Sequence, residues 1–479
     1  MSIGFPYGLD TGDANSSKED RISTGTALLS YSRHLASSAE ARSALAPQDD
    51  FWVGLNRNWE LLASVFQPGE DEGYADYLLG LTRLTRNAVA GVPENQNKAF
   101  IAEPSIRIIV QALTAGVWLN DEGYYPHVQS LAQLLSNMIT SNDTLAQRIW
   151  EAYAALPGEL SPILRLLYST DVNTIISTFV LVLNLTVESV HRTTILPETR
   201  VVVPLLDWID RVFESEEEGD EAKVFQLGYS VFSNVFQLDL FDHLFVSLSI
   251  PSHLLPPAQL TLLKLYDSYL HAPSRSTVPI SSVYSLIPSL LSLSEHIRHL
   301  QDHQQPEVNL GQGIVLVLDI VNQSVLREDA DSKSKRDLRA VLERSRGEDG
   351  VGVPESLIEL LRYLTSHTPA IHPLDEGPES TEPDALSYVN RSIVRLVSTL
   401  AHGSPEVQDR VGQVGGVELI LSLTTGDRRN PYLREHALFA VRNLLAGNVE
   451  NQKRVEGIEL QGTEDASGGI TGLKLRARE

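Results

Sequence analysis

Apolar residues recur at spacings of three and four along most of the chain, a pattern that predicts amphipathic helices. The pattern begins at Thr24 and is clear in Glu60–Phe66 and Tyr74–Val89. Breaks rich in Pro, Gly or Ser-Asn interrupt it about every 10 to 20 residues, as expected between short helices. Strict alternation of apolar and polar residues is rare. The sequence therefore predicts a fold made of many short helices.

An internal repeat links the two ends of this helical pattern. Arg86–Lys98 reads RNAVAGVPENQNK and Arg442–Arg454 reads RNLLAGNVENQKR, which are identical at seven of thirteen positions. The two copies lie 356 residues apart, close to eight units of about 44 residues. A helical period in the forties is the armadillo or HEAT length, in which each unit buries apolar surface against its neighbours. We predict an all-α, armadillo/HEAT-like superhelical solenoid of about eight to nine repeats.

Composition divides the chain into four parts. Residues 1–23 are rich in Gly, Ser, Asp and Asn and are predicted to be a disordered lead-in, followed by N-terminal armadillo-like repeats over 24–326. Residues 327–385 are predicted to be a charged and Pro-rich linker region with some helix, before a C-terminal domain over 386–479. Within the linker, Lys333–Arg346 is either a basic helix that meets an acidic partner or a solvated helix, and the second interpretation is favoured.

Asparagines flanked by apolar residues recur near helix ends. In armadillo proteins generally, an Asn at this place faces the concave groove, where its amide can pair with the backbone of an extended peptide. The alternative is that each Asn caps a turn or bonds to a neighbouring helix end. Peptide-importing adaptors place a Trp one turn earlier, and none of these positions has one. The candidate protein-binding residues are Asn87, Asn137, Asn184, Asn234 and Asn443.

The block Asp427–Arg454 contains a distinctive motif. Asn430 followed by Pro431 predicts a helix start, with Asn430 as the cap. This block, with Tyr388–Leu423 before it, resembles the C-terminal domain of the ataxin-10 family, here of the fungal type. The residues that carry the resemblance are Asp427, Asn430, Pro431, Tyr432, Arg434, Glu435, Arg442, Asn443, Leu444, Leu445, Glu450, Asn451 and Gln452.

The resemblance implies an armadillo-like cytoplasmic protein without known catalytic activity. The family is associated with cell division, in particular cytokinesis, and with binding to other proteins, and its fungal members also carry a copper-transport name. We therefore expect a non-catalytic protein-binding scaffold in the regulation of cell division. The alternative is a transport or cargo adaptor that uses the same concave groove.

Composition limits the kinds of ligand that we expect the chain to bind. With 38 basic and 62 acidic residues the net charge is −24, which disfavours broad contact with nucleic acid. Glu214–Glu221 holds six acids in eight residues, either a docking patch or, as favoured here, a solvated loop. The absence of cysteine and the two methionines argue against a copper(I) site. His296, His299 and His303 could bind copper(II), but a polar helix end is favoured, so any copper-related role is expected to be indirect.

The usual phosphate-binding, serine-hydrolase, zinc-protease and EF-hand motifs are absent from the sequence. We expect no enzyme, no cofactor, and no catalytic or metal residues. No apolar stretch reaches the length of a membrane span and the start does not look like a secretory signal, so a cytoplasmic location without membrane insertion is expected. The expected partners are proteins, and a homo-oligomer is left open.

Overall fold

The protein is described here by a computed structural model, and the chain divides into unit 1, Met1–Leu238, and unit 2, Asp239–Glu479. This boundary lies inside the region that the sequence suggested to be one run of repeats, 24–326. Each unit is described by itself below. The structure describes residues 16–70, 72–154, 156, 158–187, 189–213, 219–272, 281–300, 308–331, 337–367, 386, 388–425, 427, 430, 432–456, 458–464 and 470–477.

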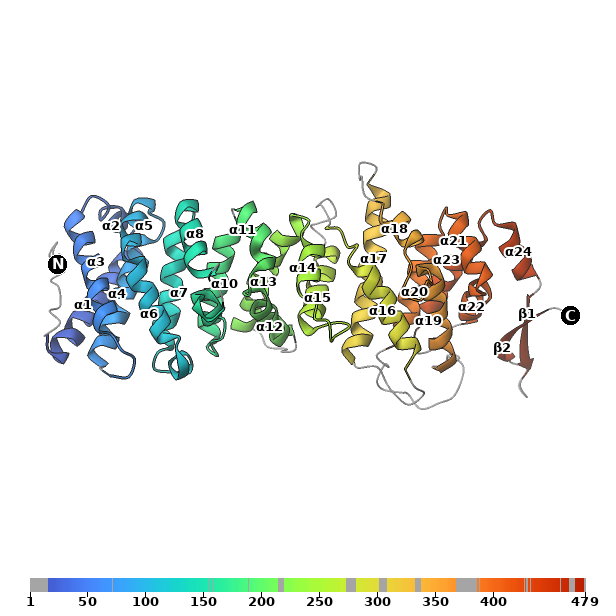
Figure 1. Ribbon diagram of the computed structural model, residues 1–479, viewed down its shortest axis with the longest axis horizontal. Helices are drawn as coiled ribbons and strands as arrows, with labels where there is room; N and C mark the ends of the chain where they lie inside the picture. The colour runs from blue at the N-terminus through green and yellow to red at the C-terminus, as the bar shows by residue number, and fades with distance from the viewer. Residues whose placement is uncertain are drawn as a thin grey trace. The chain divides into compact units, whose positions relative to one another are not determined.

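Unit 1 is a stack of helices in which one helix of each repeat packs on its counterpart in the next repeat (Figure 1). We call these the ladder helices. In unit 1 they are α1 (Lys18–Ser37), α4 (Glu72–Val89), α7 (Tyr125–Ile139), α10 (Val172–Thr186) and α13 (Asp220–Gln237). The other helices are α2 (Ala39–Ser43), α3 (Asp49–Val65), α5 (Pro93–Ala99), α6 (Glu103–Leu113), α8 (Asp143–Ile149), α9 (Pro162–Leu166), α11 (Val190–Ile195) and α12 (Val202–Phe213), with single turns η1 (Phe100–Ala102), η2 (Gly116–Asn120), η3 (Trp150–Ala154), η4 (Gly158–Leu160) and η5 (Leu196–Glu198).

The first ladder helix begins earlier than the sequence pattern suggested. The Ser17 side chain accepts a hydrogen bond from the backbone N–H of Asp20, whose carboxylate accepts from the Ser17 backbone in return. This capping box starts α1 at Lys18 instead of near Thr24, so the end of the predicted disordered lead-in is helical. In α1, Gly25 lets α4 approach closely, because a Cβ at this position would lie 2.7 Å from a backbone oxygen of α4.

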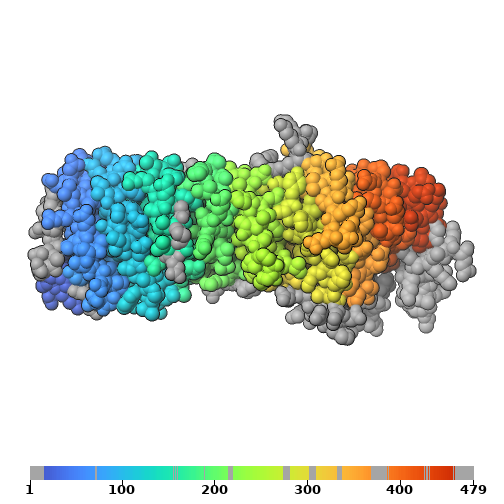
Figure 2. Space-filling view, in the orientation of Figure 1, coloured from blue at the N-terminus to red at the C-terminus, as the bar shows by residue number. Residues whose placement is uncertain are grey.

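Unit 2 repeats the same layering, and in Figure 2 the surface of each unit follows the chain in successive bands. Its ladder helices are α15 (Pro257–His271), α17 (Val308–Ala330), α20 (Val389–Ala401) and α23 (Leu433–Leu445). Its other elements are α14 (Phe241–Ser247), α16 (Leu286–Arg298), α18 (Leu338–Arg344), α19 (Val353–His367), α21 (Pro405–Gln413), α22 (Gly416–Ser422), η7 (Leu423–Thr425), α24 (Val449–Glu456), β1 (Ile458–Glu464) and β2 (Ile470–Ala477).

Much of the predicted linker is packed structure. Helix α19 lies inside residues 327–385 and buries Leu357, Leu361 and Leu364 completely or nearly so, against α16 and α20. The region was predicted to be a linker with some helix, and α19 within it is a core helix, because its apolar stripe lies between charged and proline-rich stretches of the sequence. The proline-rich stretch Pro369–Asp384 lies outside the described residues.

Helix α17 and a β-hairpin bear on the expectations that no segment spans a membrane and that the fold is all-α. The stretch Asn309–Ala330 of α17 is long and apolar enough to cross a membrane by length and composition, but 56% of its 18-residue apolar window is buried inside the unit. The strands β1 and β2 form an antiparallel hairpin that pairs Ile458 with Ala477, and this hairpin was not predicted. Apart from it, the described residues confirm the all-α, armadillo-like solenoid, since each unit is a series of stacked helices.

Candidate protein-binding surfaces

Three of the four candidate asparagines on the ladder helices of unit 1, Asn87, Asn137 and Asn184, reach back to the preceding ladder helix. Asn87 on α4 donates from Nδ2 to the backbone oxygen of Ser32 on α1 at 2.8 Å. Asn137 on α7 donates in the same way to the backbone oxygen of Arg86 at 3.2 Å. Each bond ties the end of one ladder helix to the next repeat, which is the helix-end role that the sequence left as the alternative.

The next two asparagines of unit 1 differ from each other. Asn184 on α10 donates from Nδ2 to the hydroxyl oxygens of Ser136 and Thr140, at 2.9 and 3.1 Å. Within the described residues, the Nδ2 atom of Asn234 on α13 is buried and finds no hydrogen-bond acceptor. An unsatisfied buried amide costs about 1–3 kcal/mol, so we expect Asn234 to stabilise the contact between α10 and α13 less than the other asparagines stabilise theirs.

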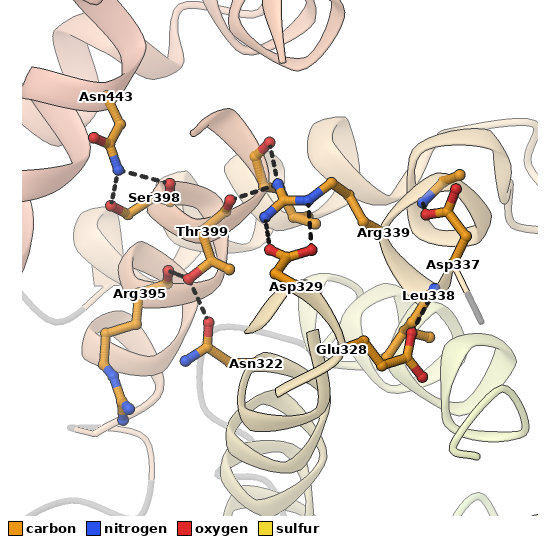
Figure 3. A network of polar contacts seen from close by, with 12 residues as sticks. Asn322, Glu328, Asp329, Asp337, Leu338, Arg339, Arg395, Ser398, Thr399 and Asn443 are labelled. Carbon is orange, nitrogen blue, oxygen red and sulfur yellow. Dashed lines mark hydrogen bonds and ion pairs between the residues drawn. The ribbon is translucent and has the colours of Figure 1, made fainter. Parts of the chain in front are cut away.

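Unit 2 contains the fifth candidate and one that the sequence reading missed. Asn443 on α23 donates to the backbone oxygen and the hydroxyl of Ser398, at 3.0 and 3.1 Å. Asn322 on α17 differs from the others, because its Oδ1 accepts a 2.7 Å hydrogen bond from the hydroxyl of Thr399 on the following ladder helix, α20 (Figure 3). Its signal in the sequence was the apolar pair Ile320-Val321 directly before it. Contact of the ladder asparagines with a partner stays a prediction.

The repeated sequence motif forms a second set of hydrogen bonds between repeats, at the turn after the ladder helix. We call such a hydrogen-bonded contact between neighbouring repeats a joint. Asn95 on α5 is fully buried and donates from Nδ2 to the backbone oxygens of Ala88 and Arg42, both at 2.8 Å. Gln96 donates to the backbone oxygens of Asn137 and Thr140 in the next repeat, at 2.9 and 3.0 Å. The two amides thus bind carbonyls at helix ends that have no partner within their own helices.

The second copy of the motif has the same geometry. Asn451 on α24 donates to the backbone oxygens of Leu444 and Gln408, at 3.0 and 2.9 Å. Gly91 and Gly447 both have φ of +72°, a left-handed conformation that glycine adopts without strain. The identity of the two copies is explained by this shared joint between repeats.

The charged segment after α17 also binds within the chain. Arg339 on α18 donates to the backbone oxygens of Thr399 and Leu400, at 2.7 and 3.0 Å, and forms an ion pair with Asp329 (Figure 3). Glu328 accepts from the backbone N–H of Leu338 at 2.9 Å, at the start of α18. Arg339 is therefore a structural residue, and the first part of the predicted basic helix, 333–336, lies outside the described residues.

The family motif begins differently from the prediction. Helix α23 starts at Leu433, with Tyr432 as the preceding residue and no side-chain cap. The predicted cap, Asn430, lies two residues before this N-cap position; it is buried, and its backbone oxygen accepts from the N–H of Leu433 at 3.0 Å. Pro431 lies outside the described residues.

One face of α23 is exposed and mixes aromatic, aliphatic and charged side chains. Leu438 and Phe439 are 51% and 58% exposed, although large apolar side chains are usually covered. We call this the α23 face. It consists of Arg434, Glu435, Leu438, Phe439 and Arg442, at helical spacings of three and four. Of the other family-motif residues, Tyr432, Glu450 and Gln452 are also exposed, and Asn451 is buried.

Two titratable groups show how the surroundings change a pKa. Burial would raise the pKa of Glu355, but hydrogen bonds of 2.6 Å from Arg410 to both carboxylate oxygens outweigh it and lower the pKa. Burial lowers the pKa of His127, whose Nε2 lies 2.9 Å from the backbone oxygen of Ala75. In both cases the pKa is shifted by burial and by contacts within the chain.

Two of the three histidines of the candidate copper(II) site lie among the described residues. His296 and His299 end α16, and the Nδ1 atom of His299 lies 2.8 Å from the backbone oxygen of Glu295. His303 lies outside the described residues. Among the residues that the structure describes, no group of three or more His, Cys, Asp or Glu side chains is placed to hold a metal ion.

Comparisons with known proteins support the resemblance. The family description "Spinocerebellar ataxia type 10 protein domain" matches residues 389–476. Ataxin-10 of Xenopus tropicalis is 35% identical over 98 residues, which are 20% of this chain and 20% of the relative. The ataxin-10 homolog of Debaryomyces hansenii is 31% identical over 113 residues, or 23% of each chain. The matches thus span about a fifth to a quarter of these relatives. The crystal structure of SYS-1 aligns with 90% of this chain and 83% of its own, at 12% identity and a TM-score of 0.32.

Proposed function

Because the chain carries the C-terminal domain of the ataxin-10 family, we propose that it is a non-catalytic, protein-binding scaffold that acts in the cytoplasm during cell division, at cytokinesis. Family and fold are typical of scaffolds without enzymatic activity. The cell-division role and the location rest on the family resemblance.

The observation that carries the proposal is the α23 face. It lies in the segment that matches the family, and it exposes Leu438 and Phe439 between Arg434 and Arg442. Exposed aromatic side chains flanked by arginine are the composition of energetically dominant contacts in protein interfaces. Covering these apolar side chains would remove their surface from water, so this helix is suited to binding another protein.

Affinity purification with mass spectrometry tests the proposal, with the full chain as bait. The test variant combines Leu438→Ala with Phe439→Ala. The matched control combines Val117→Ala with Tyr168→Ala, which removes two side chains of similar exposure, 75% and 60%, from unit 1. We expect partners to be lost from the test variant and retained by the control, with equal helicity of all three proteins. An unchanged partner set for the test variant contradicts the assignment of the α23 face.

A further inference from the structure

A groove of about 330 Å³ opens on unit 1 where α1, α4 and α7 pack side by side. Apart from Leu29 and Ala36, its lining residues are polar or basic, and no carboxylate among the described residues contributes to it. This contrasts with the charge of the whole chain, which is −24. We call it the arginine groove, and it is defined by Arg33 on α1, Arg83, Arg86 and Asn87 on α4, and Gln129 and Gln133 on α7.

The three arginines have no acidic partner within the described residues. Arg33 is exposed and Arg83 and Arg86 are half-buried, yet the structure gives none of them an ion pair with a described carboxylate. Some other half-buried arginines of the chain form ion pairs, for example Arg410 with Glu355 and Arg395 with Asp319. Placing three like charges together without compensation is unfavourable, and it favours binding of a negatively charged group.

The guanidinium of Arg86 is held in position. Its Nε donates to Asn87 Oδ1 at 3.0 Å, and its Nη1 donates to Gln133 Oε1. Burial, and next the charge of Arg83, lower the pKa of Arg86. A preorganised arginine loses less conformational freedom when it binds a carboxylate, and its planar donors fit both carboxylate oxygens.

We propose that the arginine groove binds an acidic segment of a partner protein, with glutamate or aspartate carboxylates paired to Arg33, Arg83 and Arg86. This inference rests on the proposed function of protein binding and names one site and the chemistry of its partner. The groove crosses three ladder helices, so it suits an extended segment that contacts successive repeats. The same charge repels the basic signal peptides of transport cargo.

Fluorescence anisotropy on the full chain tests the proposal. The probe is a fluorescein-labelled peptide of alternating Glu and Gly, and the comparison peptides replace Glu by Gln or by Lys. We expect saturable binding of the Glu peptide alone, with an affinity that falls several-fold between about 50 and 300 mM salt because exposed charges are screened. Equal binding of the Gln peptide contradicts the proposal.

Charge reversal locates the site. Arg33→Glu with Arg83→Glu is expected to weaken binding by about tenfold or more, since two attractive contacts become repulsive. The matched control, Arg57→Glu with Arg200→Glu, makes the same change in net charge at exposed positions of unit 1 outside the groove. It is expected to bind within about twofold of wild type. Arg33→Glu alone, at an exposed side chain, keeps the test decisive if the double variant does not fold.

Two other outcomes would show that the chain's own acidic run occupies the groove, or that the peptide binds elsewhere. If the Glu peptide binds only after Glu214, Glu216, Glu217 and Glu218 are changed to Gln, the chain's own acidic run occupies the groove, and the partner proposal is wrong. If test and control variants bind alike, the groove is not the site. In that case loss of partners from the α23 face variant still supports the scaffold function, so the two failures are distinguishable.

Discussion

The joint made by Asn95 gives the sharpest test of how the repeats hold together. The substitution Asn95→Ala removes one buried Nδ2 donor that serves the backbone oxygens of both Ala88 and Arg42 at 2.8 Å. Each lost hydrogen bond costs about 1 kcal/mol, and each carbonyl left buried adds to that cost. The Oδ1 of Asn95 is itself buried without a partner, so its removal returns a fraction. The expected loss is about 2–3 kcal/mol of the unfolding free energy of unit 1.

The assay uses the tryptophans. All five, Trp52, Trp59, Trp118, Trp150 and Trp208, lie in unit 1, so tryptophan fluorescence during urea denaturation of the full chain reports this unit. For a unit of this size a loss of 2–3 kcal/mol corresponds to a decrease in Tm of about 4–12 °C.

Two variants isolate the hydrogen bonds. Asn97→Ala makes the same chemical change at an exposed position of the same helix and is expected to alter the unfolding free energy by less than about 0.5 kcal/mol. Asn95→Asp keeps the shape but turns the donor into an acceptor facing two carbonyls, so it should destabilise more than Asn95→Ala. The reasoning is refuted if Asn95→Ala unfolds at the same urea concentration as Asn97→Ala, or if Asn95→Asp is as stable as wild type.

Three further predictions concern other contacts. Arg339→Lys should cost unit 2 about 1–3 kcal/mol, measured by circular dichroism in urea, because lysine cannot serve two carbonyls and Asp329 together. The pKa of Glu355 is lowered in the folded state, so its contribution to the stability of unit 2 is present above the unfolded pKa of about 4.3 and is lost as the pH falls below that value. The variant Glu355→Gln should lose less stability on acidification, measured by circular dichroism, and an equal loss for variant and wild type would contradict this prediction. The pKa of His127 is also lowered, so the stability of unit 1 should fall as the pH drops below about 6.5, and tryptophan fluorescence should show a smaller fall for His127→Gln.

The repeat could be predicted from the sequence because the same joint occurs at both ends of the chain. Asn95 and Asn451 each bind two carbonyls, one of them seven residues back, and Gly91 and Gly447 share one backbone conformation. A joint that uses local spacing leaves a local pattern, which a single sequence shows. The ladder asparagines were found for the same reason, although their bonds to the preceding helix needed the structure.

Contacts between distant residues could not be predicted. Arg339 was assigned to a solvated segment because its carbonyl partner Thr399 lies 60 residues further on. The arginine groove was missed because Arg33 and Arg83 meet only through the register of α1 on α4. Asn430 was assigned as a cap because its burial depends on tertiary packing. In each case a long-range contact overrides what the local pattern indicates.

Depletion and rescue, scored on cytokinesis, test the proposed scaffold role in cell division. Cells of the protein's own species are depleted of the chain and supplied with wild type, with the control Val117→Ala/Tyr168→Ala, or with Leu438→Ala/Phe439→Ala. We predict multinucleate cells on depletion, rescue by wild type and control, and failure of the α23 face variant at equal expression. Normal division after complete depletion would contradict the cell-division role, and full rescue by the α23 face variant would contradict the assigned surface.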